Sequence, residues 1–315
     1  QSRVCGRQEH PFTCRTPTIF GGIPLEPFDY VKPSTYAEAS AILVARGNTA
    51  RILQGGTDLI IRIRGEFVRP AVVVDLKGLP GMRTLAFDAE KGLTIGAAVT
   101  MNEVANDPDV DTFYRMLAEA CATVGSYQLR NRATVGGNVC NASPAGDSIP
   151  ALLCYQAVAV IYSPVQDGAR RLPLADFFKG PGKTDLQPGE FLLALELPIP
   201  PAGAVGYYNK LGRTRVGDIA VLGVAALGWP ELSNPSETAW RIALASVGPT
   251  PLLAPEAATI LADNIDEDAI EAAATAVMNA SRPIDDVRSS AAYRRAMVRV
   301  LARRAIESVV VALPI

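Results

Sequence analysis

Two pairs of adjacent glycines stand where their type and spacing could do chemistry. Gly55-Gly56 lies in "LQGGTDL", residues 53–59, and Gly136-Gly137 lies in "ATVGGN", residues 133–138. Glycine has no Cβ atom, so a phosphate can approach its backbone closely, and successive N–H groups in such a turn form an anion-binding nest. A single Gly-Gly pair is most often only a tight turn. Two pairs, each after a short apolar run, favour phosphates held between two loops.

Other nucleotide-binding motifs do not account for these glycines. The dinucleotide fingerprint G-x-G-x-x-G is absent, which argues against a Rossmann site. The segment "FKGPGKTD", residues 178–185, ends like a P-loop at Gly182-Lys183-Thr184, but the position five residues before Gly182 is Phe177 instead of glycine. Pro181 and Pro188 also argue against a helix that begins at the lysine. An ATPase is therefore excluded.

Histidine and cysteine chemistry is restricted by number and spacing. His10 is the only histidine, which excludes a histidine base or a site of several histidine ligands. Cys5 and Cys14 flank it, yet their spacing fits neither a zinc site nor a ferredoxin run, so we expect no metal in this chain. Five cysteines without a framework, and no signal-peptide pattern, lead us to expect a reducing, cytoplasmic compartment.

Composition narrows the class of partner. The 315 residues carry 30 Lys+Arg against 32 Asp+Glu, a formal charge of -2, which calls for neither nucleic acid nor an anionic membrane surface. No run reaches the roughly 18–20 apolar residues of a spanning helix. We therefore expect a soluble protein that handles a small molecule or binds a protein partner.

The elements that must position the glycines can be predicted from capping and periodicity. Thr35-x-x-Glu38 is a capping-box pattern that predicts a helix through about Arg46. The strand "ARIL" then leads into Gly55-Gly56, and "AVVVDL", residues 71–76, is typical of a strand buried on both faces. Further along, the sequence predicts a helix over 111–125, a short strand "RATVGG" before the second pair, and strands over 93–100, 157–163 and 191–198.

The pattern changes after about residue 200. The segments "GDIAVLGVAALGW" and "WRIALASVG" predict hairpin strands, and helices are expected near 253–263, 267–279 and 288–309. We therefore expect an α+β chain with an N-terminal extension over 1–22, a region over 23–200 that divides into about 23–78 and 79–200, and an α+β domain over 201–315.

The last predicted helix is strongly basic. It carries arginines at 294, 295, 299, 303 and 304, opposite an apolar side formed by Tyr293, Met297, Val300 and Leu301. This basic face could meet an acidic partner subunit, or it could be an ordinary solvated face of an amphipathic helix. Both interpretations stay open.

Four blocks together carry a family resemblance. In this order, "LQGGTDL", "ATVGGNVCNASPAGDSIPALL", "FFKGPGKTDLQPGEFLLALELP" and "YYNKLGRTRVGDIAV" resemble the FAD-binding medium subunit of the molybdenum hydroxylases, a family that includes xanthine dehydrogenase, carbon monoxide dehydrogenase and aldehyde oxidoreductase enzymes. The likeness covers roughly residues 24 to 315. It implies a two-subdomain α/β FAD-binding region of the vanillyl-alcohol-oxidase/PCMH type, followed by an α+β domain with an antiparallel sheet and helices.

The resemblance also implies roles for individual residues. Asp147 would contact the ribityl–diphosphate region, Lys210 would lie at the pyrimidine edge of the flavin, and Asp218 would border the flavin face. Without the family, Asp147 could cap a turn and Lys210 could be a surface lysine. The remaining implied cofactor-binding residues are Leu53, Gly55, Gly56, Thr57, Asp58 and Leu59 around the first glycine loop, Thr134, Gly136, Gly137, Asn138 and Ser143 around the second, and Leu192 and Leu193, which would pack near the isoalloxazine or form ordinary strand core.

The implied function is electron transfer. The chain would take electrons from 2Fe-2S clusters of a small partner subunit onto FAD and pass them to NAD, oxygen, a quinone or a protein. Substrate hydroxylation would occur at a molybdenum cofactor in a large subunit, so no catalytic residue for it is assigned here, and a dimer of heterotrimers is one possible assembly. The segment "NVCNASPAGDSIPALLC" lacks the cysteine-rich insertion of some relatives, so we expect no iron–sulfur cluster in this chain and place Cys140 and Cys154 in the interior.

Two alternatives remain at this point. A non-redox assembly or nucleotide-binding scaffold could retain the fold, although it would not need both glycine loops, Asp147 and Lys210. A self-contained flavin oxidase would need a general base, for which the sequence offers no obvious candidate.

Overall fold

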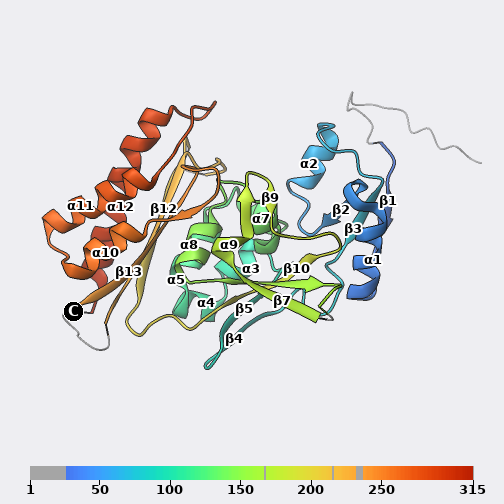
Figure 1. The fold of residues 1–315 in the computed structure, drawn as a ribbon, viewed down its shortest axis with the longest axis horizontal. Coiled ribbons are helices and arrows are strands. Elements are labelled where there is room, and N and C mark those ends of the chain that lie inside the picture. The colour runs from blue at the N-terminus through green and yellow to red at the C-terminus, as the bar shows by residue number, and fades with distance from the viewer. Residues whose placement is uncertain (1–25, 167, 215, 232–236, 315) are drawn as a thin grey trace, which may run out of the picture.

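The computed structural model describes residues 26–166, 168–214, 216–231 and 237–314. Its elements form three units in a row along the long axis of the molecule (Figure 1). The predicted fold class, an α/β region followed by an α+β unit with an antiparallel sheet and helices, is confirmed. The predicted extension over 1–22, with Cys5, His10 and Cys14, lies outside the described residues.

The first unit is a small parallel sheet with two helices. Its strands run in the order β1 (Asp29–Val31), β3 (Val72–Asp75) and β2 (Ala50–Leu53). The helices are α1 (Tyr36–Arg46) and α2 (Leu59–Arg64), and a 3-10 turn, Gly47–Thr49, follows α1. As predicted, α1 begins after Thr35, whose Oγ1 accepts a hydrogen bond from the backbone N–H of Glu38 at 3.1 Å. The Glu38 carboxylate, however, accepts from the N–H of Ser34 instead of Thr35, at 2.7 Å.

The central unit is built on a five-stranded antiparallel sheet. Its order is β4 (Leu85–Asp88), β5 (Gly92–Gly96), β10 (Phe191–Leu197), β6 (Val158–Ser163) and β7 (Gly168–Pro173). A bulge in β10 shifts the pairing with β6 between Leu192 and Ala194. The other elements of this unit are α3 (Met101–Ala105), α4 (Pro108–Phe113), α5 (Arg115–Ala122), α6 (Tyr127–Arg130), α7 (Val135–Asn141), α8 (Ser148–Cys154), α9 (Leu174–Phe177), β8 (Phe178–Gly180) and β9 (Lys183–Thr184).

The single helix predicted over 111–125 is wrong. The segment divides into α4 and α5 at Tyr114, which has φ -132° and ψ 38°. The Tyr114 ring is fully buried, and its hydroxyl donates to the carbonyl oxygen of Pro198 at 3.0 Å. Tertiary packing of one aromatic side chain thus overrides a continuous helical pattern, which is a known limit of helix propensity.

The short strand predicted before the second glycine pair is also wrong. Thr134 forms only an isolated bridge with Thr100 and then serves as the N-cap of α7. Its Oγ1 accepts from the N–H of Gly137 at 3.0 Å, so the glycine pair lies inside the first turn of a helix. Similarly, the strand predicted over 93–100 ends at Gly96, and Thr100 caps α3. Both threonines accept a backbone hydrogen bond with their hydroxyls at the start of a helix. This local hydrogen bond competes with strand formation.

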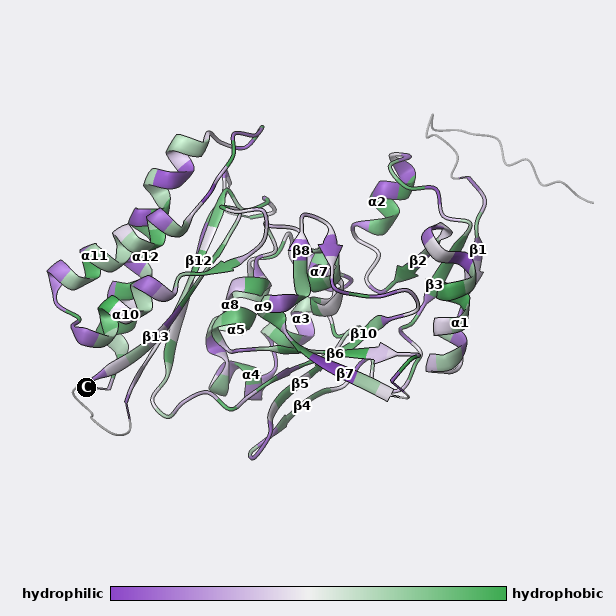
Figure 2. Cartoon of the chain, in the orientation of Figure 1, coloured by the Kyte–Doolittle hydropathy of each residue, from purple (hydrophilic) through white to green (hydrophobic). Residues whose placement is uncertain are grey.

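The third unit is a four-stranded antiparallel sheet covered by helices on one face. The strands β11 (Val205–Leu211), β12 (Leu222–Pro230), β13 (Thr238–Ala245) and β14 (Leu252–Leu253) lie in chain order. The predicted helices are present as α10 (Pro255–Asp263), α11 (Glu267–Ala280) and α12 (Ala291–Ala312). In Figure 2, α11 and α12 carry both hydrophilic and hydrophobic segments, as amphipathic helices on a sheet do.

Strand β12 separates two hydrophobic cores. Leu222, Val224 and Ala226 point into the core shared with the helices. Ala225 and Leu227, on the opposite face, belong to the larger core of the central unit. This alternation is the period-two pattern of a strand buried on both faces. The larger core spans the predicted boundaries near residues 78 and 200, and those boundaries stay predictions.

The faces of α12 differ from those expected. Arg294, expected on a basic surface, is buried, and its guanidinium binds Asp286 and the carbonyl oxygen of Ser246. Tyr293 and Val300, expected on the apolar side, are exposed. The side that packs on the sheet consists of Val298, Leu301, Ala302, Ala305, Ile306 and Val309. Arg294 lies in the interior because it pairs with Asp286, although its Nε atom has no hydrogen-bond partner among the described residues. Charge alone therefore did not reveal the inner face.

Two outer arginines of α12 have acidic partners within the chain. Arg299 and Arg303 both pair with Glu271 of α11, and Arg303 also pairs with Glu307 at 2.7 Å. These contacts are typical of a solvated helix surface. Within the described ranges, no helix combines the length and apolarity needed to span a membrane.

Candidate functional site

The two glycine loops lie against each other. The first follows β2 and the second begins α7, in different units of the fold. A Cβ atom on Gly55 would overlap the carbonyl oxygen of Arg132 and would lie 3.0 Å from the Cα atom of Ala133. Only glycine permits this approach, so the first loop is closed onto the segment that leads into the second.

The glycines of the two pairs serve different purposes. Gly56 has φ +77°, the left-handed region that glycine adopts without strain. Gly136 and Gly137 do not have positive φ values, because they lie in α7. Gly136 is instead needed for close packing, since a Cβ atom there would lie 2.6 Å from both Cα and O of Ala97. The positive-φ explanation of a glycine turn therefore applies to only one of these four residues.

Several backbone N–H groups at this junction are unpaired. Among the described residues, four N–H groups donate no hydrogen bond to the protein: those of Gly55, Gly56, Thr57 and Gly136. The N–H of Gly137, in contrast, donates to Oγ1 of Thr134. Unpaired N–H groups on neighbouring residues create a positive concavity suited to an anion. The arrangement fits a phosphate held between the loops, with the amide of Gly137 fixing the turn.

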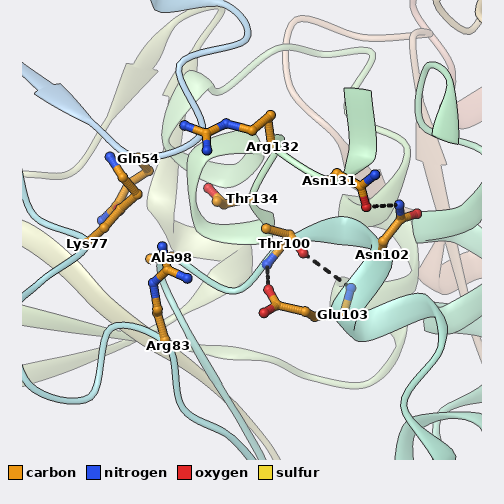
Figure 3. A pocket seen from close by; sticks show the side chains of 10 residues that line it. All are labelled: Gln54, Lys77, Arg83, Ala98, Thr100, Asn102, Glu103, Asn131, Arg132 and Thr134. Atoms are coloured by element: carbon orange, nitrogen blue, oxygen red, sulfur yellow. Dashed lines mark hydrogen bonds between the residues drawn. The ribbon is translucent and has the colours of Figure 1, made fainter. Parts of the chain in front are cut away.

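A cavity of about 340 Å³ opens beside the loops. Gln54 and Lys77 line it from the first unit, and Thr100, Arg132 and Thr134 line it from the central unit (Figure 3). Oε1 of Gln54 is buried and has no hydrogen-bond partner within the part of the chain that the structure describes. An unsatisfied buried acceptor costs about 1–3 kcal/mol, and a ligand could satisfy this one only after the Gln54 amide turned toward the cavity.

Asp147 and Lys210 form a buried ion pair close to the second loop. Lys210, on β11, places its Nζ atom 2.7 Å from Oδ2 of Asp147 and 2.9 Å from the carbonyl oxygen of Thr123. Tyr208, two residues earlier on the same face of β11, donates its hydroxyl to Oδ1 of Asp147 at 2.8 Å. Asp147 caps no helix with its side chain, and Lys210 is not a surface lysine.

Burial and these partners set the electrostatics of the pair. Burial raises the pKa of the Asp147 carboxyl, and the Lys210 ammonium and the Tyr208 hydroxyl lower it only in part. Burial, together with the Asp147 charge, also raises the pKa of the Tyr208 hydroxyl well above its usual value. Tyr208 is thus a neutral donor, and each charge of the pair depends on the other.

Several other predicted site residues lie around the loops with defined partners. Asn138 accepts a hydrogen bond from the Ser148 hydroxyl at 2.9 Å, and the Ser143 hydroxyl accepts from the N–H of Ala145 at 3.2 Å. Asp58 precedes α2 without a side-chain cap, and burial raises its pKa. The remaining loop residues, Leu53 and Leu59, end β2 and begin α2.

The leucines of β10 belong to the sheet. Leu192 is a buried core residue that pairs with Ile161, and Leu193 lies at the bulge, where its carbonyl oxygen accepts from the N–H of Ala97. Ala97 is the residue that contacts Gly136, so the bulge supports the second glycine loop. These two leucines can therefore be residues of the sheet and still lie near the candidate site.

Asp218 stands apart from the charged pair. It binds Arg213 in its own loop, with Oδ1 2.9 Å from Nη2, and the Arg213 guanidinium holds the pKa of the Asp218 carboxyl well below its usual range. The loop nevertheless borders the site, because the N–H of Gly217 donates to Gly125, two residues beyond the Thr123 carbonyl that binds Lys210. The structure thus gives Asp218 a part in shaping the loop.

The sequence interpretation missed Gln54, Tyr208 and the cationic lining of the cavity. Alternation along "YYNKL" could have placed Tyr208 on the face of Lys210, since strand residues two apart share a face. Cys154 is buried, as expected, whereas Cys140 is only partly so. Burial raises the pKa of the Cys154 thiol to about 12, so it stays protonated at neutral pH.

Family models match almost all of the described chain. The model described as "FAD binding domain in molybdopterin dehydrogenase" matches residues 26–200. The model described as "CO dehydrogenase flavoprotein C-terminal domain" matches residues 206–309. Asp147 and Lys210 therefore come from different matched regions.

Curated relatives are similar over nearly their whole length. The chain is 33% identical over 285 residues to the carbon monoxide dehydrogenase medium chain of Afipia carboxidovorans, covering 89% of this chain and 96% of the relative. It is 30% identical over 285 residues to a putative xanthine dehydrogenase FAD-binding subunit of Escherichia coli, covering 90% of this chain and 96% of the relative.

Solved structures have the same architecture. A carbon monoxide dehydrogenase from Hydrogenophaga pseudoflava, in a form that lacks the Mo-pyranopterin moiety of its molybdenum cofactor, matches with a TM-score of 0.87 and 29% identity, covering 92% of this chain and 100% of that chain. Quinoline 2-oxidoreductase from Pseudomonas putida 86 matches with a TM-score of 0.82 and 28% identity, covering 91% of this chain and 98% of that chain.

Proposed function

The chain belongs to the family of FAD-binding medium subunits of molybdenum hydroxylases, and we propose that it transfers electrons through FAD within a multi-subunit dehydrogenase. It takes electrons from 2Fe-2S clusters of a small subunit and passes them to an external acceptor. The substrate is oxidised at a molybdenum cofactor in a large subunit. Relatives named as medium chains support this division of labour.

One observation carries the proposal: the two glycine loops, with their unpaired N–H groups, adjoin a buried aspartate–lysine pair. An anionic diphosphate suits the amides of Gly55, Gly56 and Thr57. The Cβ-free surfaces of the loops and the unpaired Oε1 of Gln54 are also features that a polar nucleotide would fill. The residues present therefore fit FAD.

Asp147 and Lys210 each keep a free hydrogen-bonding position that a ligand could use. The ammonium group of Lys210 has three donors, of which Asp147 and Thr123 use two. The third donor can bind a carbonyl oxygen at the pyrimidine edge of a flavin. Asp147 accepts one hydrogen bond on each oxygen and can accept others from ribityl hydroxyls.

FAD itself supplies the ability to receive electrons singly and to release them in pairs. The protein would bind the cofactor, orient it and present the ammonium group of Lys210, which is paired with Asp147, at one edge. The remaining N–H donor of this ammonium would favour the form of the cofactor with added negative charge, which makes reduction easier. This role needs no general base, in agreement with the lack of a histidine among residues 26–315.

The remaining assignments are likewise proposals, which the likeness to medium chains of multi-subunit enzymes supports. The partners are a small 2Fe-2S subunit and a large subunit with the molybdenum cofactor, arranged as a dimer of heterotrimers, in the cytoplasm. NAD, oxygen, a quinone and a protein are the acceptor classes to be tried. A scaffold without redox function would have no use for the Lys210 donor or for the unpaired amides, and these features count against it.

The experiment is cofactor analysis followed by electron transfer. The purified chain is denatured, and the released small molecule is identified by mass; about one FAD per chain is expected. The complex with its small and large subunits is then given substrate without an acceptor, and bleaching of the flavin absorbance is followed. A folded chain that contains no flavin and takes up none would support the scaffold role instead.

A further inference from the structure

We propose that Arg83 and Arg132 form a clamp for the adenosine diphosphate half of the cofactor, an inference that rests on the proposed FAD function. The two arginines line the cavity beside the glycine loops, and neither belongs to a glycine loop. Figure 3 shows both side chains extending toward the space that Gln54 and Thr134 also face. The clamp would bind the diphosphate end of the cofactor, and other residues would bind the flavin ring.

The acidic side chains around the cavity do not fully neutralise the positive charges of these two arginines. Lys77 also lines the cavity, but its Nζ atom lies 2.7 Å from Oδ1 of Asp75. The carboxylate of Glu103 accepts from the N–H of Thr100 at 2.6 Å in the capping box of α3. With Lys77 offset by Asp75, the two arginines outweigh the single Glu103 charge.

Arg83 and Arg132 have free donors. Within the described parts of the chain, neither side chain forms a hydrogen bond or an ion pair. A guanidinium presents five N–H donors in a planar fork that matches two oxygens of a phosphate. Two such groups facing one cavity therefore favour a phosphate-bearing ligand over a neutral one.

The backbone holds both arginines at the junction of the two units. The carbonyl oxygen of Arg132 lies against Gly55, and its N–H donates to Leu129 at 2.9 Å. Arg83 follows Met82, whose Sδ atom receives a hydrogen bond from Nε2 of Gln54 at 3.7 Å. The clamp thus has fixed bases and free ends beside the first glycine loop.

The uncharged lining identifies the rest of the ligand. Thr134, whose oxygen already accepts from Gly137, can still donate its own proton to a phosphate oxygen. Oε1 of Gln54 is buried and unpaired, so its amide has to turn toward the cavity before a ligand can reach it. Once turned, it would accept from a ribose hydroxyl or an adenine amino group of a nucleoside diphosphate.

The test measures ligand affinity with no turnover. FAD is removed from the full chain, and ADP, FMN and FAD are titrated by calorimetry at two salt concentrations into the wild type and into R83Q and R132Q. The matched control is R46Q, because Arg46 is an exposed arginine at the end of α1, outside the cavity. R132K keeps the charge without the planar fork.

We expect ADP to bind the wild type. R83Q and R132Q should each weaken ADP and FAD binding by about tenfold, which corresponds to about 1.4 kcal/mol, and leave FMN binding unchanged. The loss should shrink at high salt, and R132K should recover part of the affinity.

Two results would overturn the clamp while leaving the FAD function intact. In the first, FAD binds normally but ADP does not bind. In the second, R83Q and R132Q bind ADP and FAD as R46Q does. Failure of the wild type to take up any FAD would instead overturn both the proposed function and the clamp. Thermal melting of each variant shows that the fold is kept.

Discussion

The Nζ atom of Lys210 lies 2.7 Å from Oδ2 of Asp147, and this contact joins two regions that different family models match. Neither charge is accessible to bulk water to any large extent, so each stabilises the other in the folded chain. Thr123 and Tyr208 complete the hydrogen bonding of the pair. A site formed in this way depends on how the C-terminal sheet is seated on the central unit.

Removal of the lysine should destabilise the fold in a pH-dependent manner. Lys210→Ala leaves the Asp147 carboxylate buried without its cation, which typically costs about 3 kcal/mol. Burial already raises the pKa of Asp147. A raised folded-state pKa contributes stability below the unfolded value and loses it as pH rises, so the difference between K210A and the wild type should be largest at pH 7 and should shrink toward pH 4. Urea unfolding at both pH values measures this difference.

The control for this prediction is the double variant K210A/D147N, in which no uncompensated charge remains. It should be more stable than K210A at pH 7. Equal stability of the single and double variants would mean that the ion pair does not contribute to folding.

The same lysine should tune the flavin. Lys210→Ala should retain FAD but make its reduction harder, because the donor at the pyrimidine edge is lost. One hydrogen bond to a charged group is worth about 1.5–3 kcal/mol, and about 1.4 kcal/mol corresponds to 30 mV for a two-electron couple. We therefore expect a midpoint potential more negative by roughly 30–60 mV, measured by dye-equilibrated reduction. An unaltered potential would remove Lys210 from the flavin site.

Substitutions at Gly136 and Gly137 test whether close packing at the second glycine loop is needed for FAD binding. Gly136→Ala places a Cβ atom 2.6 Å from the backbone of Ala97, so α7 must shift and FAD content should fall at least tenfold. Gly137→Val should also abolish FAD binding, because its side chain would meet Oγ1 of Thr134 and occupy the space of the phosphate. Gly78→Ala is the control, since nothing lies within 4 Å of its Cβ position. Full flavin content in G136A would contradict the loop assignment.

The C-terminal unit should lose stability when Asp286 is neutralised. The Arg288 and buried Arg294 guanidiniums hold the pKa of the Asp286 carboxyl well below its usual range. Stability from this group is present above its unfolded value near 3.8 and is lost as pH falls further. Asp286→Asn should therefore cost about 3 kcal/mol at pH 7 and less at pH 3.

Tryptophan fluorescence during urea unfolding measures this change, because Trp229 and Trp240 both lie in the C-terminal unit. Asp263→Asn, at an exposed position that ends α10, should change little and serves as the control. A cost of Asp286→Asn that is the same at both pH values would exclude the ion pair as its cause.

Regular elements with a single dominant cause could be predicted from sequence. The Thr35 cap located the start of α1, and the β-branched run located β3. The prediction failed where a tertiary contact decided the structure, as where burial of Tyr114 divides one helix into two. It also failed at Thr134, because a hydroxyl that caps a helix and a β-branched residue in a strand look the same in sequence.

The site could be predicted only in part for a similar reason. The glycine pairs have a local signature, and the family blocks supplied Asp147 and Lys210. Arg83 and Arg132 have no signature, because exposed arginines are common and only folding places these two beside one cavity. The unsatisfied oxygen of Gln54 is likewise a property of packing, which composition and spacing do not encode.

The contact between Gly55 and the Arg132 carbonyl oxygen indicates which residues would be kept in a relative that no longer transfers electrons. The contact is a packing requirement of the empty fold, so selection for folding alone would keep Gly55 in a lineage that had given up electron transfer. Lys210 and Asp147 form a buried ion pair, and apolar side chains could replace both residues together at no cost in stability. Joint loss of this pair, more than loss of a glycine, would therefore mark a relative that has abandoned its cofactor.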